Sequence, residues 1–197
     1  MNFNKILIIM VIVVVAFTAV NIFMTLSNRL QIETVSYDSE YEYDAGGTVI
    51  MRSIMLLKFD KPSQIEQFFG QFDKDKETKI SEFQQSVDQI SKDLPRSMVV
   101  SDFASTATQV ANDMVEVEEY SVIKGFAGVE NDQINTSIGD LKIDLQDDSK
   151  LTFLLPPDSE TLSVDPAPTY SPQNNILIWE GTGEIKFPEV IFTAEGR

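Results

Sequence analysis

The acidic stretch FDKDKETKISEFQ is the part of this sequence whose residue types and spacing best suit chemistry. Asp73, Asp75 and Glu77 occupy alternate positions, like the first oxygen ligands of an EF-hand calcium loop. The residue that normally bends such a loop, a glycine, is replaced by Thr78, and the bidentate glutamate that closes it is replaced by Gln84. We therefore expect a solvated charged turn and no dedicated metal site, and keep the three acids as candidate ligands of a weak, cation-responsive site.

A second group of acids follows the single tryptophan, Trp179. Its members are Glu180, Glu184 and Glu189. A tryptophan beside paired carboxylates is typical of a glycoside-hydrolysing site. A core tryptophan at the end of a strand can have the same acidic neighbours, so a sugar site and a core residue both stay open as interpretations. The chain has no histidine and no cysteine, which excludes Ser-His-Asp and Cys-His catalysis and histidine-ligated zinc. We predict no catalytic residue, no cofactor and no cofactor-binding residue.

One modification signal is present. Asn135 begins the only Asn-x-Ser/Thr sequence of the chain, Asn-Thr-Ser, which makes it a glycosylation candidate if it lies in an outward-facing loop.

These residues need elements to position them, and the first is a predicted hairpin. Apolar and acidic residues alternate over Val35–Asp44, which predicts a strand with one aromatic face and one acidic face. Ala45-Gly46-Gly47 supplies a turn into a more apolar strand over Thr48–Asp60. The tyrosines of the first strand suit a core face, or alternatively a ligand-stacking face.

A helical pattern comes next. Ser63 and Glu66 have the spacing of a capping box, and apolar residues then recur at helical intervals as far as Leu94, before Pro95. The charged stretch between Asp73 and Lys79 interrupts the apolar face, so this region is either two helices or one long bent helix packed on the sheet.

The rest of the chain, from Met98 onward, is predicted to be β, although Met98–Val110 could instead form a short helix. Gly125-Phe-Ala-Gly128 is interpreted as a turn, Leu141–Leu145 and Lys150–Leu155 as a hairpin, and the proline-flanked segments as edge strands. The remaining strand predictions are Met98–Val110, Met114–Lys124, Thr161–Val164, Ile176–Trp179 and Glu189–Ala194.

Residues 6–26 form an almost unbroken apolar run with no charged residue. As a helix, these 21 residues would span about 32 Å, which matches the hydrocarbon core of a bilayer. We expect an uncleaved anchor in contact with membrane lipid, preceded by a cytoplasmic tail at residues 1–5. A cleaved signal and a pilin-like assembly helix are the alternatives. Lys5 lies before the run, so the positive-inside rule favours an N-terminus inside the cell and a C-terminal domain outside it.

Acidic residues dominate the composition: 31 Asp and Glu stand against 15 Lys and Arg, for a net charge of −16. All 31 acidic residues but only 14 of the 15 Lys and Arg follow the apolar run, so the chain after this run carries a net charge of −17. Such a surface repels nucleic acid, and we exclude a nucleic-acid partner. The length of residues 30–197 suits one domain.

The closing stretch LPPDSETLSVDPAPTYSPQNNILIWEG resembles the closing segment of uncharacterised prokaryotic membrane-anchored surface proteins. These proteins have an LPP-like start, a strand, a Pro-x-Pro, an Asn-rich turn and a Leu-x-Trp-x-Gly strand. The resemblance implies an outward-facing, β-rich domain of unknown function, and it brings no catalytic residue. Many such proteins have their anchor at the C-terminus, whereas the apolar run of this chain is at its N-terminus.

Together these patterns predict an α+β protein: a transmembrane helix at residues 6–26, then one extracytoplasmic domain at residues 30–197. This domain is expected to combine antiparallel hairpins with a helical hairpin or one long helix packed on the sheet. The expected function is that of a structural or interaction module of the cell envelope with a protein partner there. An envelope-polymer hydrolase that uses acidic residues and a weak cation-responsive module are the alternatives.

Overall fold

A computed structural model describes residues 32–70 and 72–194 of the chain. Strands make up 54% and helices 14% of these residues, so the predicted α+β class is wrong and the fold is mostly β. The predicted anchor at residues 6–26 and the tail at residues 1–5 lie outside the described residues. Within the described ranges, no helix combines the length and the apolar character needed to cross a bilayer.

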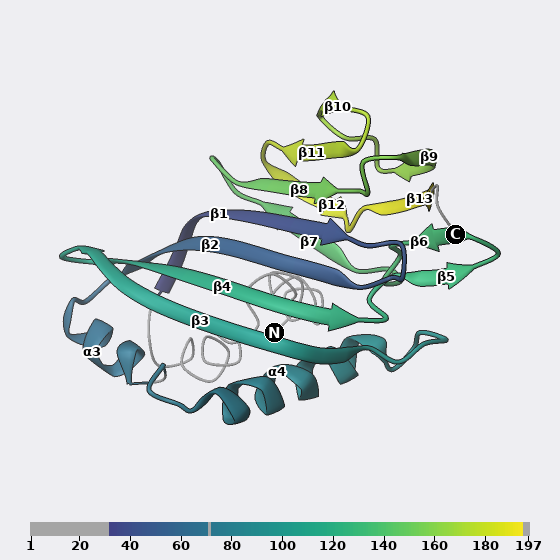
Figure 1. The fold of residues 1–197 in the computed structure, drawn as a ribbon. Coiled ribbons are helices and arrows are strands. Elements are labelled where there is room, and N and C mark those ends of the chain that lie inside the picture. Colours follow the sequence, from purple (N-terminus) through teal and green to yellow (C-terminus); the bar gives the residue numbers. More distant parts are fainter. Residues whose placement is uncertain (1–31, 71, 195–197) are drawn as a thin grey trace.

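The largest element of the fold is a seven-stranded sheet, called the main sheet below (Figure 1). In spatial order it contains β10 (Tyr170–Gln173), β11 (Ile176–Glu180), β8 (Lys150–Leu154), β1 (Ile32–Tyr43), β2 (Val49–Phe59), β4 (Met114–Lys124) and β3 (Val99–Ala111). The predicted hairpin at the N-terminal end of the domain is confirmed, because β1 and β2 pair antiparallel from Ile32 opposite Phe59 to Tyr43 opposite Val49.

The alternation within β1 divides its side chains between two environments. Tyr37, Tyr41 and Tyr43 are buried, with exposed fractions of 5%, 0% and 3%, which confirms the core interpretation of these tyrosines. The acids between them lie on the opposite face, because successive residues of a strand point to opposite sides of a sheet.

The predicted hairpin of residues 141–145 with residues 150–155 is wrong. β8 pairs parallel with β1 and antiparallel with β11 in the main sheet. The preceding strand, β7 (Lys142–Leu145), instead pairs with β12 (Gly183–Lys186) in a separate two-stranded sheet. The turn at Gln146–Ser149 therefore carries the chain from one sheet to another.

A four-stranded second sheet completes the β structure, in the order β5 (Gly128–Glu130), β6 (Gln133–Asn135), β13 (Glu189–Ala194) and β9 (Ser159–Asp165). The proline-flanked segments were predicted as edge strands, and this is wrong for β11 and β13, which each lie between two neighbours. An aromatic cluster joins the main sheet to the second sheet and to the segment that follows β12. Its rings are those of Tyr41, Tyr43, Phe126, Phe153, Phe187 and Phe192.

The predicted helical region divides into α3 (Ser63–Phe69) and α4 (Lys76–Ser91). The predicted capping box is absent, since Pro62 is the N-cap of α3 and no side chain caps its start. α4 runs along the edge strand β3, where the rings of Phe83 and Phe103 are 4.8 Å apart (Figure 1). Gln84 accepts a hydrogen bond from the Val100 amide and donates one to the Met98 carbonyl, so it satisfies backbone groups at this edge.

Phe153 offers a direct test of the aromatic cluster. Its ring contacts those of Tyr41, Tyr43, Phe187 and Trp179, with centroid distances of 5.0–5.5 Å. We expect Phe153→Ala to lower the free energy of unfolding by about 3–5 kcal/mol, because it leaves a cavity in a fully buried site. Denaturant unfolding followed by the fluorescence of the single tryptophan measures this change.

Leu162→Ala is the matched control, because Leu162 is 46% exposed and its truncation should change stability by no more than about 0.5 kcal/mol. A loss no larger for Phe153→Ala than for this control would contradict the described core.

Candidate functional site

The face of the main sheet that points away from the aromatic cluster is its open face. Cross-strand neighbours place Arg52 between Glu40 and Tyr120 on this face. The Arg52 guanidinium lies 3.1 Å from Glu40 and 2.9 Å from Glu42, and 6.0 Å from the centre of the Tyr120 ring. The hydrogen bond from Arg52 to Glu42, followed by smaller charge effects, raises the pKa of the guanidinium. These contacts hold a charged network on the open face.

Apolar side chains lie beside the acids on the same face. Ile54, which is 48% exposed, has Asp38 directly opposite on one neighbouring strand and Glu118 on the other. One step along β2 on this face, Leu56 lies opposite Glu116. The open face therefore places apolar groups, exposed at Ile54 and half-buried at Leu56, beside carboxylates.

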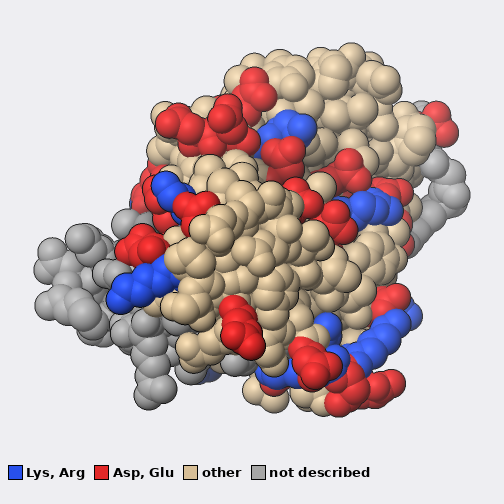
Figure 2. Space-filling model, turned by 90° about the vertical axis from the view of Figure 1, so that its left-hand side faces the viewer, with Lys and Arg blue, Asp and Glu red and all other residues tan. Residues whose placement is uncertain are grey.

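Figure 2 shows the side of the molecule at the left of Figure 1, where Asp and Glu side chains surround a broad uncharged area and Lys or Arg side chains accompany many of them. A hollow of about 600 Å³ lies at one end of the open face, where Lys150 stands between Asp38 and Glu180 on adjacent strands. The Lys150 ammonium is 3.7 Å from Asp38.

The second acid of the calcium-like stretch, Asp75, has a structural role. Asp75 is the N-cap of α4, and its two carboxylate oxygens accept hydrogen bonds of 2.8 Å from the Thr78 amide and the Thr78 hydroxyl. The bond from the Thr78 amide, and then that from its hydroxyl, hold the pKa of Asp75 below its usual range. Asp73 precedes the helix and Glu77 lies in its first turn.

The three candidate ligands are not brought together. In the described ranges, no group of three or more acidic side chains is arranged to hold a metal ion. The neighbouring lysines pair elsewhere: Lys74 with Glu82 and Lys76 with Asp102, both at 2.7 Å. Gln84, at the closing position of the motif, is engaged with the edge of β3. That this stretch binds a cation only weakly stays a prediction.

The tryptophan lies in the core and its neighbouring acids diverge. Trp179 is 2% exposed and donates a hydrogen bond to the Pro166 carbonyl, so the interpretation as a core residue is confirmed. Glu184 pairs with Lys142 and Glu189 pairs with Lys186, while Glu180 lines the hollow at the end of the open face. These separate pairings give no shared site for two carboxylates.

The glycosylation candidate lies in a strand, whereas its glycosylation was expected only if it lay in an outward-facing loop. Asn135 belongs to β6, where its amide donates to Glu189 at 3.3 Å and accepts from the Ser137 backbone at 2.7 Å. Thr136 is fully buried, with its hydroxyl bonded to the Pro188 carbonyl and the Val190 amide. The fold thus engages the side chains of Asn135 and of the middle residue of the sequence, Thr136.

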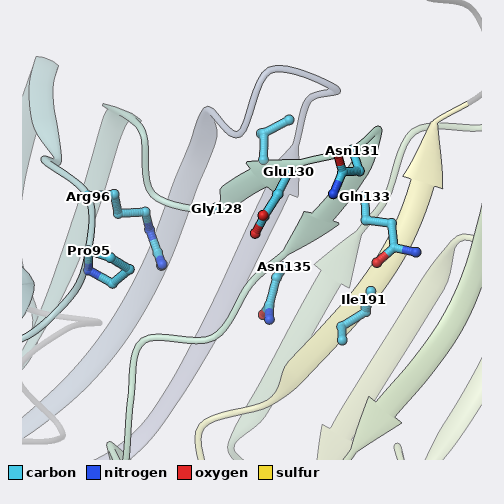
Figure 3. Close-up of a pocket in the computed structure, with 9 residues that line it drawn as sticks. Pro95, Arg96, Gly128, Glu130, Asn131, Gln133, Asn135 and Ile191 are labelled. Atoms are coloured by element: carbon cyan, nitrogen blue, oxygen red, sulfur yellow. The ribbon is translucent and has the colours of Figure 1, made fainter.

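A pocket that the sequence did not indicate lies beside Arg96, in the segment between α4 and β3 (Figure 3). Its volume is about 470 Å³, and it is lined by Pro95, Arg96, Gly128, Val129, Glu130, Asn131, Gln133, Asn135 and Ile191. The lining comes from three places in the chain: the segment before β3, the β5–β6 hairpin with its turn, and β13.

Arg96 is held by backbone carbonyls. Its guanidinium donates to Gly125, Phe126 and Ser137, at distances of 2.6–3.2 Å. Partial burial of the guanidinium lowers its pKa, and the group stays protonated because its ordinary value is so high. Only a turn with glycine at Gly125 fits here, because its φ is +71° and an added Cβ would collide with the Ser97 carbonyl.

The architecture is that of a layered, mostly β domain with one open, mixed acidic and apolar sheet face and a separate polar pocket. Residues 32–193 match the model of the family described as a domain of unknown function, DUF4897, and the chain belongs to this family. A search of curated proteins found no match. Among solved structures, the chain is similar to the folded domain of LppM from Mycobacterium tuberculosis, determined by NMR. That likeness has 9% identity and a TM-score of 0.44, and covers 82% of this chain and 90% of the other.

A substitution of Asp75 separates its two possible roles, the cap of α4 and a calcium ligand. We expect Asp75→Ala to lower the thermal midpoint of unfolding without any calcium present, because it removes the cap of α4. Asp73→Ala is the matched control and should leave the midpoint unchanged. Calcium should bind with millimolar or weaker affinity in titration calorimetry, and a micromolar site abolished by either substitution would contradict this explanation.

The pH dependence of the same variant follows from the lowered pKa of Asp75. A depressed pKa in the folded state means that the cap contributes fully above the unfolded value of about 3.9 and is lost as pH falls through the lower folded value. The difference between Asp75→Ala and the unsubstituted protein should therefore be constant near neutral pH and shrink in strong acid.

Proposed function

We propose that this protein is a membrane-anchored, extracytoplasmic binding module of the cell envelope, and that the open face of the main sheet is its contact surface. The partner is a protein segment that presents lysine or arginine side chains beside apolar ones. The observation that carries this proposal is the position of Ile54, half exposed between the carboxylates of Asp38 and Glu118.

Burial on one side supports the choice of face. The aromatic cluster lies on the inner side of the main sheet and α4 packs along its edge strand β3, so the outer side is the one left for a partner. An apolar group flanked by carboxylates matches a segment with alternating apolar and cationic side chains, because each contact is complementary. Desolvation of the partner's apolar groups would supply affinity, and the acids would supply orientation and a faster encounter.

The placement of β1 supports an outward presentation. An anchor at residues 6–26 would enter the domain at Ile32, the first residue of β1. The β1–β2 turn lies at the other end of this strand, about 36 Å away for a strand of its length. The open face then extends from the membrane side of the domain to its far end.

The alternative of hydrolysis receives less support from the same contacts. Glu184 and Glu189 are each paired with a lysine, and the aromatic ring beside them is buried in the core. A binding role requires no converging pair of carboxylates.

The predicted orientation is tested by proteolysis. Protease added to intact spheroplasts should digest residues 30–197, because the domain faces outward and the anchor keeps it in the membrane fraction. Digestion that occurs only after lysis would show that the orientation is reversed.

The contact surface is tested with a defined probe, a peptide of alternating lysine and valine, against the full chain in nanodiscs of zwitterionic lipid. Glu116→Gln with Glu118→Gln should weaken binding by about tenfold, because it removes two carboxylates from the open face. Ile54→Ser should also weaken binding, and this loss should persist at high salt, where charge effects are screened.

Asp158→Asn with Glu160→Gln is the matched control. It changes the net charge by the same amount at exposed positions outside the open face, and should alter affinity by less than about twofold. Equal losses for the two double variants would mean that the peptide responds only to net charge, and the proposed surface would be wrong.

A further inference from the structure

We propose that the pocket beside Arg96 binds a small zwitterion, a free amino acid or a short peptide, with its carboxylate on Arg96 and its ammonium on Glu130. This inference is independent of the open face, because the pocket is built from different elements.

The guanidinium has capacity left for a ligand. Nε and Nη2 make all of its hydrogen bonds to the carbonyls of Gly125, Phe126 and Ser137. In the described part of the chain, Arg96 forms no ion pair with a carboxylate, and Nη1 has no hydrogen-bond acceptor. A partly desolvated cation that is held by neutral carbonyls keeps its whole charge, so a ligand carboxylate would gain a charge-assisted hydrogen bond there.

Gly128 keeps Nη1 accessible. A Cβ on this residue would lie 3.5 Å from Nη1 and 3.9 Å from the Asn135 carbonyl oxygen. The missing side chain therefore leaves open the space directly above the unused donor, and a larger residue would fill it.

The opposite charge comes from the β5–β6 hairpin. Asn131 and Asp132 both have positive φ, 49° and 63°, which forms a tight two-residue turn and pairs Glu130 with Gln133. Figure 3 shows the Glu130 carboxylate directed toward the same open space as the Arg96 guanidinium. Glu130 would repel a simple anion at this position and would attract the ammonium of a zwitterion.

The remaining lining suits a short polar molecule. Asn131 and Gln133 contribute amide groups, while Val129 and Ile191 contribute limited apolar surface. A volume of about 470 Å³ accommodates an amino acid or a short peptide. The pocket lies near the β1–β2 turn, where the Ala127 amide donates to the Gly47 carbonyl at 3.0 Å, and so at the end of β1 far from Ile32.

The test uses diglycine as the zwitterionic probe, with acetate and ethylamine as the two half-probes. Amide chemical shifts of the isotope-labelled full chain in detergent micelles report binding. We expect diglycine to shift the amides of Gly128 and Glu130, and to bind about tenfold more tightly than either half-probe.

Two substitutions test the two halves of the pocket, one the partner of the ammonium and the other the donor to the carboxylate. Glu130→Gln should weaken diglycine by about tenfold and leave acetate equal or tighter, because it removes the partner of the ammonium only. Gly128→Val should abolish binding of diglycine and acetate by covering Nη1. Thermal melting establishes that each variant is folded, and Glu130→Gln remains decisive if Gly128→Val does not fold.

Glu160→Gln is the matched control, since this exposed acid lies outside the pocket and its loss changes the net charge equally. If Glu130→Gln leaves the affinity for diglycine unchanged or raises it, the proposal of a zwitterion site is wrong and the pocket is a plain anion site. No shift with diglycine up to about 50 mM would overturn the site altogether.

Discussion

The parallel pairing of β1 with β8 is the contact on which the rest of the structure depends. It joins strands that lie more than a hundred residues apart, and the Tyr37 amide donates to the Ser149 hydroxyl across a separation of 112 residues. The register sets Tyr41 directly beside Phe153, with their rings 5.3 Å apart, and so places the centre of the aromatic cluster. Without this pairing, the main sheet would separate into an N-terminal and a C-terminal part. The cost of closing so long a loop is recovered by burying large aromatic side chains.

The same register determines what the open face presents. Because side chains alternate along a strand, burying the tyrosines of β1 leaves Asp38, Glu40 and Glu42 on the outer side. A slip of one residue would exchange the two sets, burying carboxylates and exposing rings, so the register is strongly specified. The candidate contact surface is therefore a direct consequence of core packing. Its acids are kept exposed by the same force that buries the aromatic residues.

Local patterns were predictable from the sequence and long-range pairings were not. The β1–β2 hairpin and the strands β3 and β4 follow from period-two alternation and a glycine turn, and were confirmed. The fold class was wrong because strands such as β5 and β6, with three residues each, are too short to show a period, and because the partner of β8 is distant in sequence. Asp75 was identified as a notable acid but not as a cap, although a capping residue ahead of a helix is a readable local signal.

The pocket shows why a site can escape sequence reasoning in so acidic a chain. Arg96 meets carbonyls that lie 29–41 residues away, and no spacing rule connects them. The net charge of −16 suggests a surface that attracts only cations, yet that field is screened beyond about 8–10 Å at physiological salt. Close to the guanidinium, the local charge decides. Since neutral carbonyls rather than carboxylates hold Arg96, its positive charge is not cancelled within the fold, and Glu130 supplies a negative group beside it. The two proposed sites, an acidic sheet face for a cationic partner and a paired-charge pocket for a zwitterion, are compatible in one domain, because each depends on charges within its own screening length.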